Sequence, residues 1–167
     1  MSGGEAEFVE FASAALPRLR RTARLLCGDP DLAEDLTQTA LLKVFVSWHR
    51  SAAWHNPQAY AQRVLYTTFC SWAGRRWNAE LATADPPERP GTDPFEVSDT
   101  GRVHAELLRL PRRQRAVLIA RYYDDLSVEQ AAELLSCSES TVRAQASRGL
   151  QRLRDALEPA HSLAEES

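Results

Sequence analysis

The sequence lacks a long apolar run and a paired-cysteine motif, and each absence excludes a class of protein. No stretch approaches the roughly 20 apolar residues that a membrane-spanning helix needs. The N-terminal stretch MSGGEAEFVE has neither the basic nor the apolar region of a signal peptide. We therefore expect a cytoplasmic protein. The 3 cysteines are far apart, with no nearby pair of histidines, which argues against a disulfide framework or a zinc site and favours buried, reduced thiols.

Signatures of catalysis are also missing. Neither HExxH nor a glycine-rich phosphate loop occurs, and the histidines are scattered: His49, His55, His104 and His161. No nucleophile has an evident base partner. We therefore expect no catalytic residue, no metal and no cofactor, and a hydrolase or nuclease is the least favoured class.

Charge and proline divide the chain into segments. At 167 residues it is long enough for one ordinary domain or two small ones. The net charge of −3 is uneven, with +2 on residues 1–78, −5 on 79–100, +2 on 101–158 and −2 on 159–167. The acidic segment 79–100 also holds four of the nine prolines. We therefore expect domains at 1–78 and 101–158, a flexible linker at 79–100 and a tail at 159–167.

Helical periodicity dominates the segment before the linker, and no alternating strand pattern appears. Gly28 is a natural helix end, while Asp29 with Pro30 and, later, Pro57 are typical helix starts. The apolar residues expected to face the core recur every three or four positions: Leu16, Leu19, Ala23, Leu26, Leu36, Ala40, Val44, Trp48, Ala61, Leu65, Phe69 and Trp72. We predict three or four helices in one bundle.

The segment after the linker predicts two helices divided at Pro111, followed by a helix-turn-helix. Ser127 and Gln130 are spaced as a capping box. Ser136 occupies the turn position where such motifs usually place glycine, so it must adopt the turn conformation or the turn must differ. In the last helix an apolar stripe faces inward, Val142, Ala146, Leu150, Leu153 and Leu157, and the outer face is polar and basic, as in a major-groove reader. An ordinary helical hairpin with solvated arginines is the alternative.

Four stretches together resemble a known family. They are GDPDLAEDLTQTAL, NPQAYAQRVLYTTFCSWAGRR, LPRRQRAVLIARYYDDLSVEQAAELL and STVRAQASRGLQRLR, in that order. They resemble the sigma-70 family of RNA polymerase subunits, and within it the extracytoplasmic-function (ECF) group in its actinobacterial style. The resemblance implies an all-α fold with two small helical domains, a sigma-2 bundle and a sigma-4 helix-turn-helix domain, joined by the acidic, proline-rich linker. It also implies binding to core RNA polymerase and recognition of the −10 and −35 promoter elements.

The resemblance assigns residues to three surfaces. The −10 set interleaves aromatic and basic residues, as a single-strand binder should: Trp54, His55, Asn56, Arg63, Thr67, Ser71, Arg75 and Arg76. The −35 set begins at a helix N-terminus, which favours phosphate, and offers guanidinium forks for guanine edges: Glu139, Ser140, Thr141, Arg143, Ala144, Ser147 and Arg148. The polymerase-binding set mixes polar and apolar residues: Asp35, Gln38, Thr39, Leu42 and Phe45.

The expected partners are core RNA polymerase and promoter DNA, duplex at −35 and melted at −10, with an anti-sigma factor as a further candidate. Arg112, Arg113 and Arg115 are expected to touch phosphate or polymerase. An autonomous repressor or activator is the main alternative, and it would bind duplex DNA tightly without polymerase and prefer paired half-sites. The mildly positive modules favour a reader tethered to polymerase, because a separate DNA binder must supply its own phosphate neutralisation.

Overall fold

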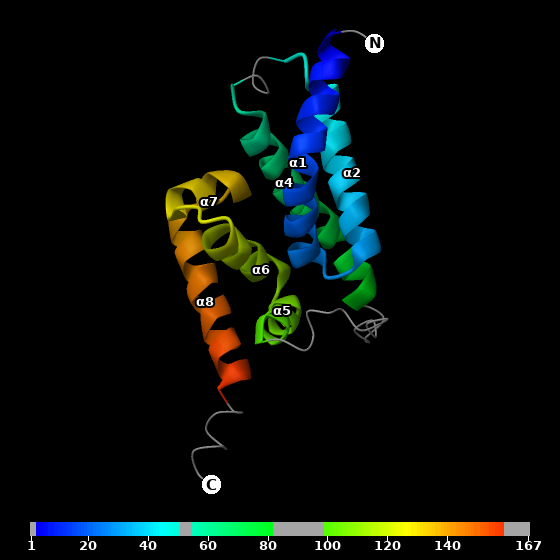
Figure 1. Cartoon of the computed structure of the whole chain (residues 1–167). Coiled ribbons are helices and arrows are strands. Elements are labelled where there is room, and N and C mark those ends of the chain that lie inside the picture. The colour runs from blue at the N-terminus through cyan, green and yellow to red at the C-terminus, as the bar shows by residue number, and fades with distance from the viewer. Residues whose placement is uncertain (1–2, 51–54, 82–98, 159–167) are drawn as a thin grey trace. The chain divides into compact units, whose positions relative to one another are not determined.

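The computed structural model describes residues 3–50, 55–81 and 99–158, and these ranges contain helices and no strand (Figure 1). The helices are α1 (Gly3–Cys27), α2 (Pro30–Val46), α4 (Pro57–Leu81), α5 (Asp99–Arg109), α6 (Arg112–Leu118), the π-helical turn η2 (Ile119–Tyr123), α7 (Val128–Leu135) and α8 (Glu139–Leu157). The chain divides into two units, Met1–Gly74 and Arg75–Ser167. Helices α4 and α5 enter both ends of the expected linker, while residues 82–98 and the tail 159–167 lie outside the described residues.

The first unit is a bundle in which α1, α2 and the first half of α4 bury one face each. The predicted stripes are confirmed for ten residues: Leu19, Ala23, Leu26, Leu36, Ala40, Val44, Trp48, Ala61, Leu65 and Phe69 are buried. On α1 the stripe is shifted slightly, because Ala15 is buried where Leu16 is half-buried. The side chain of Trp72 lies outside the described residues.

The junction between α1 and α2 forms as its local sequence predicts. Gly28 has a positive φ of 75°, which glycine adopts without strain, and its N–H donates to Arg24 O at 2.9 Å. One carboxylate oxygen of Asp29 accepts the backbone N–H of Asp31 at 2.8 Å and that of Leu32 at 3.4 Å. These contacts end one helix and start the next within two residues. They bring α1 and α2 side by side (Figure 1).

Four aromatic rings join the start of α1 to the end of α2. The Phe8 centroid lies 5.0 Å from that of Phe45 and 5.4 Å from that of Trp48, and the Phe11 and Trp48 centroids are 5.2 Å apart. Such tilted and edge-on pairs each contribute about 0.5–1.5 kcal/mol beyond their buried area. Trp48 is buried, whereas Phe45 remains 39% exposed. Phe45 therefore packs on α1 with one side and meets solvent with the other.

The second unit packs α8 against α5, α6 and α7. Its chain breaks between α5 and α6 at Pro111, as predicted. Gly149 on α8 allows a close approach to α6, because a Cβ there would lie 2.9 Å from Leu118 Cδ1. Small residues on α7, Ala131 and Ala132, are buried at the other helix crossing.

The helix-turn-helix forms with the predicted cap and with a strained turn residue. Ser127 Oγ accepts the Gln130 N–H at 3.0 Å, and the Gln130 side chain accepts the Ser127 N–H at 2.9 Å, which completes the capping box. Ser136 adopts φ 53° and ψ 47°, in the left-handed region. The serine therefore takes the conformation that glycine usually supplies in this motif, the first of the two predicted options.

Arg115 corrects one expectation. The sequence placed it on the surface with Arg112 and Arg113, available to phosphate or polymerase. In the structure Arg115 is only 3% exposed, and its Nη2 donates to Leu108 O and to Leu110 O, each at 3.0 Å. These two carbonyls lie at the end of α5, where helical carbonyls lack intrahelical partners. Arg115 therefore joins α5 to α6. The expectation that it contacts phosphate or polymerase is wrong.

Candidate nucleic-acid and protein interfaces

A network of hydroxyl groups closes the first turn of α8. Ser138 Oγ accepts the Thr141 backbone N–H at 3.1 Å and lies 2.8 Å from Thr141 Oγ1. Ser140 Oγ lies 3.0 Å from the same Ser138 oxygen. Glu139 and Ser140 are exposed, whereas Thr141 is half-buried. Thr141 is thus engaged in the cap, and the more accessible groups at this end belong to Glu139 and Ser140.

The middle of α8 presents the other predicted −35 residues to solvent: Arg143, Ala144, Ser147 and Arg148 are exposed. On the opposite side Val142 is fully buried. No residue that the structure describes forms an ion pair with Arg143 or Arg148. Both guanidinium forks can therefore bind base edges or phosphates without first breaking a contact within this part of the protein.

A shallow groove runs beside that face, between η2 and α8. Its charged and polar lining comes from six residues: Arg121, Tyr122, Arg143, Ser147, Gln151 and Arg154. Arg121 Nη1 donates to Leu126 O at 2.6 Å, and its guanidinium carbon lies 5.7 Å from the Tyr122 ring centroid. Tyr122 is 56% exposed. The sequence analysis did not place Arg121 and Tyr122 beside the exposed face of α8. The only feature of the sequence that indicated this position was a pair of aromatic residues before a polar turn.

A polar stripe follows the exposed face of α4. Arg63, Thr67 and Ser71 are exposed and are spaced four residues apart, which places them on one face. Thr67 Oγ1 donates back to Arg63 O at 2.8 Å. At the start of the helix His55 and Asn56 are exposed, and Asn56 Oδ1 accepts the Ala59 N–H at 3.1 Å. Trp54 and the side chains of Arg75 and Arg76 lie outside the described residues.

The outward face of α2 carries the predicted polymerase-binding residues. Asp35, Gln38, Leu42 and Phe45 are exposed and Thr39 is half-buried. Leu42 is 62% exposed although it is apolar, and Val46, which sequence reasoning missed, is 68% exposed one turn further along. The signal for Val46 was its spacing of four from Leu42. This face therefore combines polar groups at one end with an apolar patch at the other.

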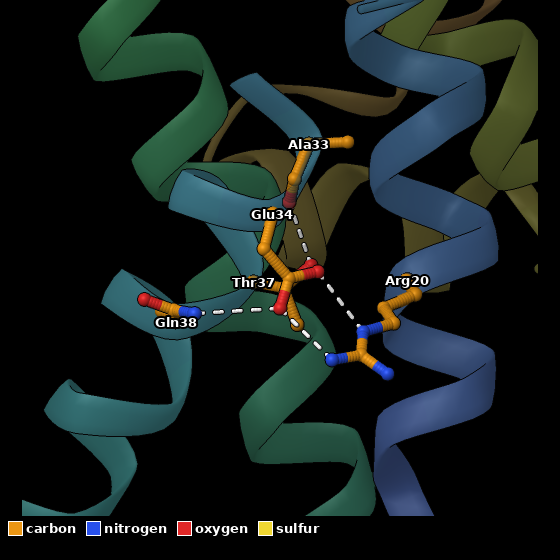
Figure 2. Close-up of polar contacts among 5 residues, drawn as sticks. All are labelled: Arg20, Ala33, Glu34, Thr37 and Gln38. Carbon is orange, nitrogen blue, oxygen red and sulfur yellow. Dashed lines mark hydrogen bonds and ion pairs between the residues drawn. The ribbon is translucent and has the colours of Figure 1, made fainter. Parts of the chain in front are cut away.

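An ion pair borders this face where α1 meets α2 (Figure 2). Arg20 binds the Glu34 carboxylate with both arms of its fork, through Nε at 3.0 Å and Nη2 at 2.9 Å. Gln38 Nε2 donates to Glu34 Oε1 at 3.3 Å. The hydrogen bond from Arg20, helped by that from Gln38, lowers the pKa of Glu34 from its ordinary value, and the same bond raises the pKa of Arg20. Glu34 thus positions Gln38 on the α2 face.

The described residues also bear on metal binding, membrane insertion and disulfide formation. Over the described ranges, no group of three or more His, Cys, Asp or Glu side chains could hold a metal ion. No helix there is long and apolar enough to cross a membrane. Full burial of the cysteines was expected, but all three are half-buried, and no disulfide joins them: Cys27, Cys70 and Cys137.

Known proteins match this chain over both units. The model for Sigma-70 region 2 matches residues 11–78, and that for Sigma-70, region 4 matches residues 100–153. The RNA polymerase sigma-E factor of Streptomyces avermitilis is 34% identical over 95% of this chain and 89% of that protein. The ECF RNA polymerase sigma factor EcfG of Rhodopseudomonas palustris is 29% identical over 84% of this chain and 79% of its own.

A solved structure is similar in fold over most of the chain. The co-crystal structure of the sigma factor RpoE with the anti-sigma factor NepR from Bartonella quintana matches with a TM-score of 0.70 and 26% identity, covering 91% of this chain and 97% of that chain.

The fold and these surfaces define an all-α, two-domain protein of the helix-turn-helix type. The chain belongs to the sigma-70 family, in its ECF group. It is a sigma factor of RNA polymerase and acts in transcription initiation.

Proposed function

We propose that this protein is the non-catalytic promoter-specificity subunit of RNA polymerase and acts in the cytoplasm. Residues 1–78 form the sigma-2 domain and residues 101–158 the sigma-4 domain, joined by the linker 79–100 and followed by the tail 159–167. The observation that carries the proposal is that α2 and α8 each bury one face in their own domain and leave a second face exposed. The exposed face mixes polar and apolar residues on α2, as a protein interface does, and is polar and basic on α8, as a DNA-binding face is. An anti-sigma factor is a candidate partner, since the matching RpoE was solved with one.

The exposed face of α2 binds core polymerase through Asp35, Gln38, Thr39, Leu42 and Phe45. Leu42 is the apolar centre of this face. Its side chain is 62% exposed, so most of it is left uncovered by the residues that the structure describes. Burying such a leucine in an interface contributes about 1.5–3 kcal/mol. The apolar patch therefore supplies affinity, while the polar groups around it fix the orientation of the partner.

Co-elution with purified bacterial core polymerase on gel filtration tests this surface. We expect Leu42→Ala to weaken the complex by about 1–2 kcal/mol, a factor of about 5–30 in affinity. Val9→Ala is the matched control, because Val9 is also apolar and 51% exposed but lies on α1. If the native protein fails to co-elute and instead binds duplex DNA tightly by itself, the autonomous-regulator alternative replaces this proposal.

The exposed stripe of α4 holds the melted −10 strand. Arg63 neutralises phosphate, Thr67 and Ser71 offer hydroxyls, and His55 and Asn56 lie at the start of the same helix with Trp54 preceding them. Arg75 and Arg76 continue the basic character toward the end of α4. Single-strand binders combine a basic track along the backbone with side chains that contact the bases.

The exposed face of α8 reads the −35 element through Glu139, Ser140, Thr141, Arg143, Ala144, Ser147 and Arg148. We expect Arg143→Ala to lower discrimination between cognate and altered −35 duplexes by about 1–3 kcal/mol, the cost of one lost bidentate contact. Arg109→Ala is the control, because Arg109 is also an exposed arginine of the second unit but lies on α5. Equal loss of affinity for every duplex would show that Arg143 contacts phosphate and reads no base.

A further inference from the structure

The first turns of α1 pack on the end of α2 and on the residues that follow it. Gly4, Phe8 and Phe11 recur at intervals of four and three residues, which places them on one face of α1. The Phe8 ring packs on Phe45 and Trp48, and the Phe11 ring packs on Trp48. Because α1 and α2 run in opposite directions, the start of the first helix meets the end of the second (Figure 1).

Gly4 shows how closely these two segments approach. A Cβ built on Gly4 would lie only 2.8 Å from Cε1 of the His49 imidazole. His49 is exposed, so its ring rests on the backbone of α1 from outside. The contact at Gly4 and the ring contacts at Phe8 therefore hold α1 against the same end of α2 at two successive turns.

Phe45 joins this aromatic cluster to the proposed polymerase-binding face. Among the clustered rings Trp48 is buried, whereas Phe45 is exposed on one side. The exposed apolar side chains of Leu42 and Val46 lie within one turn of Phe45 on α2. One side of the Phe45 ring is thus available to polymerase, and Phe8 supports the other side.

The contact with Phe8 restricts the motion of the Phe45 ring. The two ring centroids are 5.0 Å apart and the ring planes are inclined by 60°, a tilted arrangement that aromatic pairs favour. An exposed side chain without such support changes rotamer on a picosecond to nanosecond timescale. Immobilising it when a partner binds weakens the affinity, and a side chain that is already held in place avoids this loss.

We propose that Phe8 is a positioning residue for polymerase binding, because it holds the Phe45 ring in the orientation in which that ring packs on core polymerase. Phe8 acts through Phe45. The inference rests on the proposed polymerase-binding role of α2, and it extends the binding machinery to the start of α1. The match to Sigma-70 region 2 begins at residue 11, so Phe8 lies before the matched region, and the sequence analysis assigned it no role.

Removing the Phe8 ring tests the proposal. Phe8→Leu keeps an apolar side chain, and Phe11→Leu is the matched control, because Phe11 belongs to the same cluster but packs on Trp48. The full chain, labelled with fluorescein at its C-terminus, is titrated with core polymerase well below its melting temperature, and anisotropy gives the affinity. We expect Phe8→Leu to bind about two- to tenfold more weakly, the factor for one side chain that must be immobilised on binding. Phe11→Leu should bind like the native protein.

A double-mutant cycle shows whether Phe8 acts through Phe45. In a Phe45→Ala background the ring that Phe8 positions is absent, so Phe8→Leu should cause no further loss of polymerase affinity. Phe8→Tyr keeps the ring and should bind like the native protein. Equal losses from Phe8→Leu in the native and Phe45→Ala backgrounds would overturn the proposal, because they would show that Phe8 acts independently of Phe45.

Thermal unfolding separates positioning from packing. Phe8→Leu and Phe11→Leu each remove one ring from the cluster, so both should lower the melting temperature of the first unit. Only Phe8→Leu should also lower the polymerase affinity. If both variants lose affinity in proportion to their loss of stability, the cluster serves the fold alone and the positioning role is wrong.

Leu42→Ala distinguishes failure of this inference from failure of the polymerase-binding role of α2. If Leu42→Ala weakens the complex while Phe8→Leu binds as the native protein does, the α2 face stands and the positioning role is wrong. If neither Leu42→Ala nor Phe45→Ala changes the affinity, the proposed role of α2 fails, and the positioning role of Phe8 fails with it.

Discussion

Ser136 connects α7 to α8 in a conformation that few residues other than glycine adopt. Its φ of 53° and ψ of 47° are left-handed, and its side chain is exposed. The turn is closed by backbone atoms, with Ser136 N–H donating to Glu133 O at 3.3 Å and Cys137 N–H to Ala132 O at 3.0 Å. A glycine at this position keeps both bonds and removes the clash of Cβ with the backbone. Ser136→Gly is therefore expected to stabilise the second unit.

The size of the stabilisation by Ser136→Gly follows from two opposing effects. A residue with a Cβ costs about 1–2 kcal/mol in the left-handed region. Glycine gives back about 0.5–1 kcal/mol, because it has more conformational freedom to lose on folding. Taken at the midpoints of the two ranges, the net stabilisation is about 0.75 kcal/mol, which for a unit of about 60 residues raises the melting temperature by about 3–6 °C.

The assay must observe the second unit. Three of the four tryptophans precede the boundary at Gly74, so tryptophan fluorescence follows mainly the first unit, and far-UV circular dichroism with hydrogen exchange in α7 and α8 is needed. Ser136→Ala, which keeps Cβ, should melt like the native protein. Glu133→Gly, at an exposed position inside α7, should lose about 1 kcal/mol. If Ser136→Gly loses stability as Glu133→Gly does, the turn stores no strain and the reasoning is refuted.

Two further predictions concern packing and charge. Gly149→Ala places Cβ 2.9 Å from Leu118 Cδ1 in a buried contact. The overpacking costs about 1–3 kcal/mol and should exceed the gain in helix propensity of about 1 kcal/mol, so the melting temperature should fall. An unchanged melting temperature would show that Leu118 moves aside. Because its pKa is lowered in the folded state, Glu34 stabilises the protein above its unfolded pKa of about 4.3 and ceases to do so as the pH falls through the folded pKa. The difference in thermal stability between native protein and Glu34→Gln should therefore vanish in acid, and a difference independent of pH would contradict the ion pair.

Much of the fold could be predicted because its signals are local. Helix starts at Asp29 and Ser127 depend on side chains that reach only two or three residues along the chain, and the structure shows both caps. The apolar spacing of three and four residues identifies the buried face of a helix regardless of what covers it. The strain at Ser136 was also foreseeable, since the motif requires a left-handed residue wherever that turn forms.

The candidate surfaces were predicted only in part, because exposure depends on which helices pack together. Arg115 looks like its neighbours Arg112 and Arg113 in the sequence, and only the carbonyls at the end of α5 decide that it is buried. Val46 and Tyr122 are exposed because nothing in the described structure covers them, although each is apolar or aromatic and adjacent to residues of the core.

The helical class, the two domains, the caps and the family to which the chain belongs can be predicted from side-chain types at fixed spacings. Which polar groups find partners depends instead on how the helices pack. Arg20 and Glu34 meet across two helices at 2.9 Å, whereas Thr22 Oγ1 and Gln62 Nε2 have no hydrogen-bond partner among the described residues. Such pairings join residues far apart in sequence, and no local pattern encodes the distance between them.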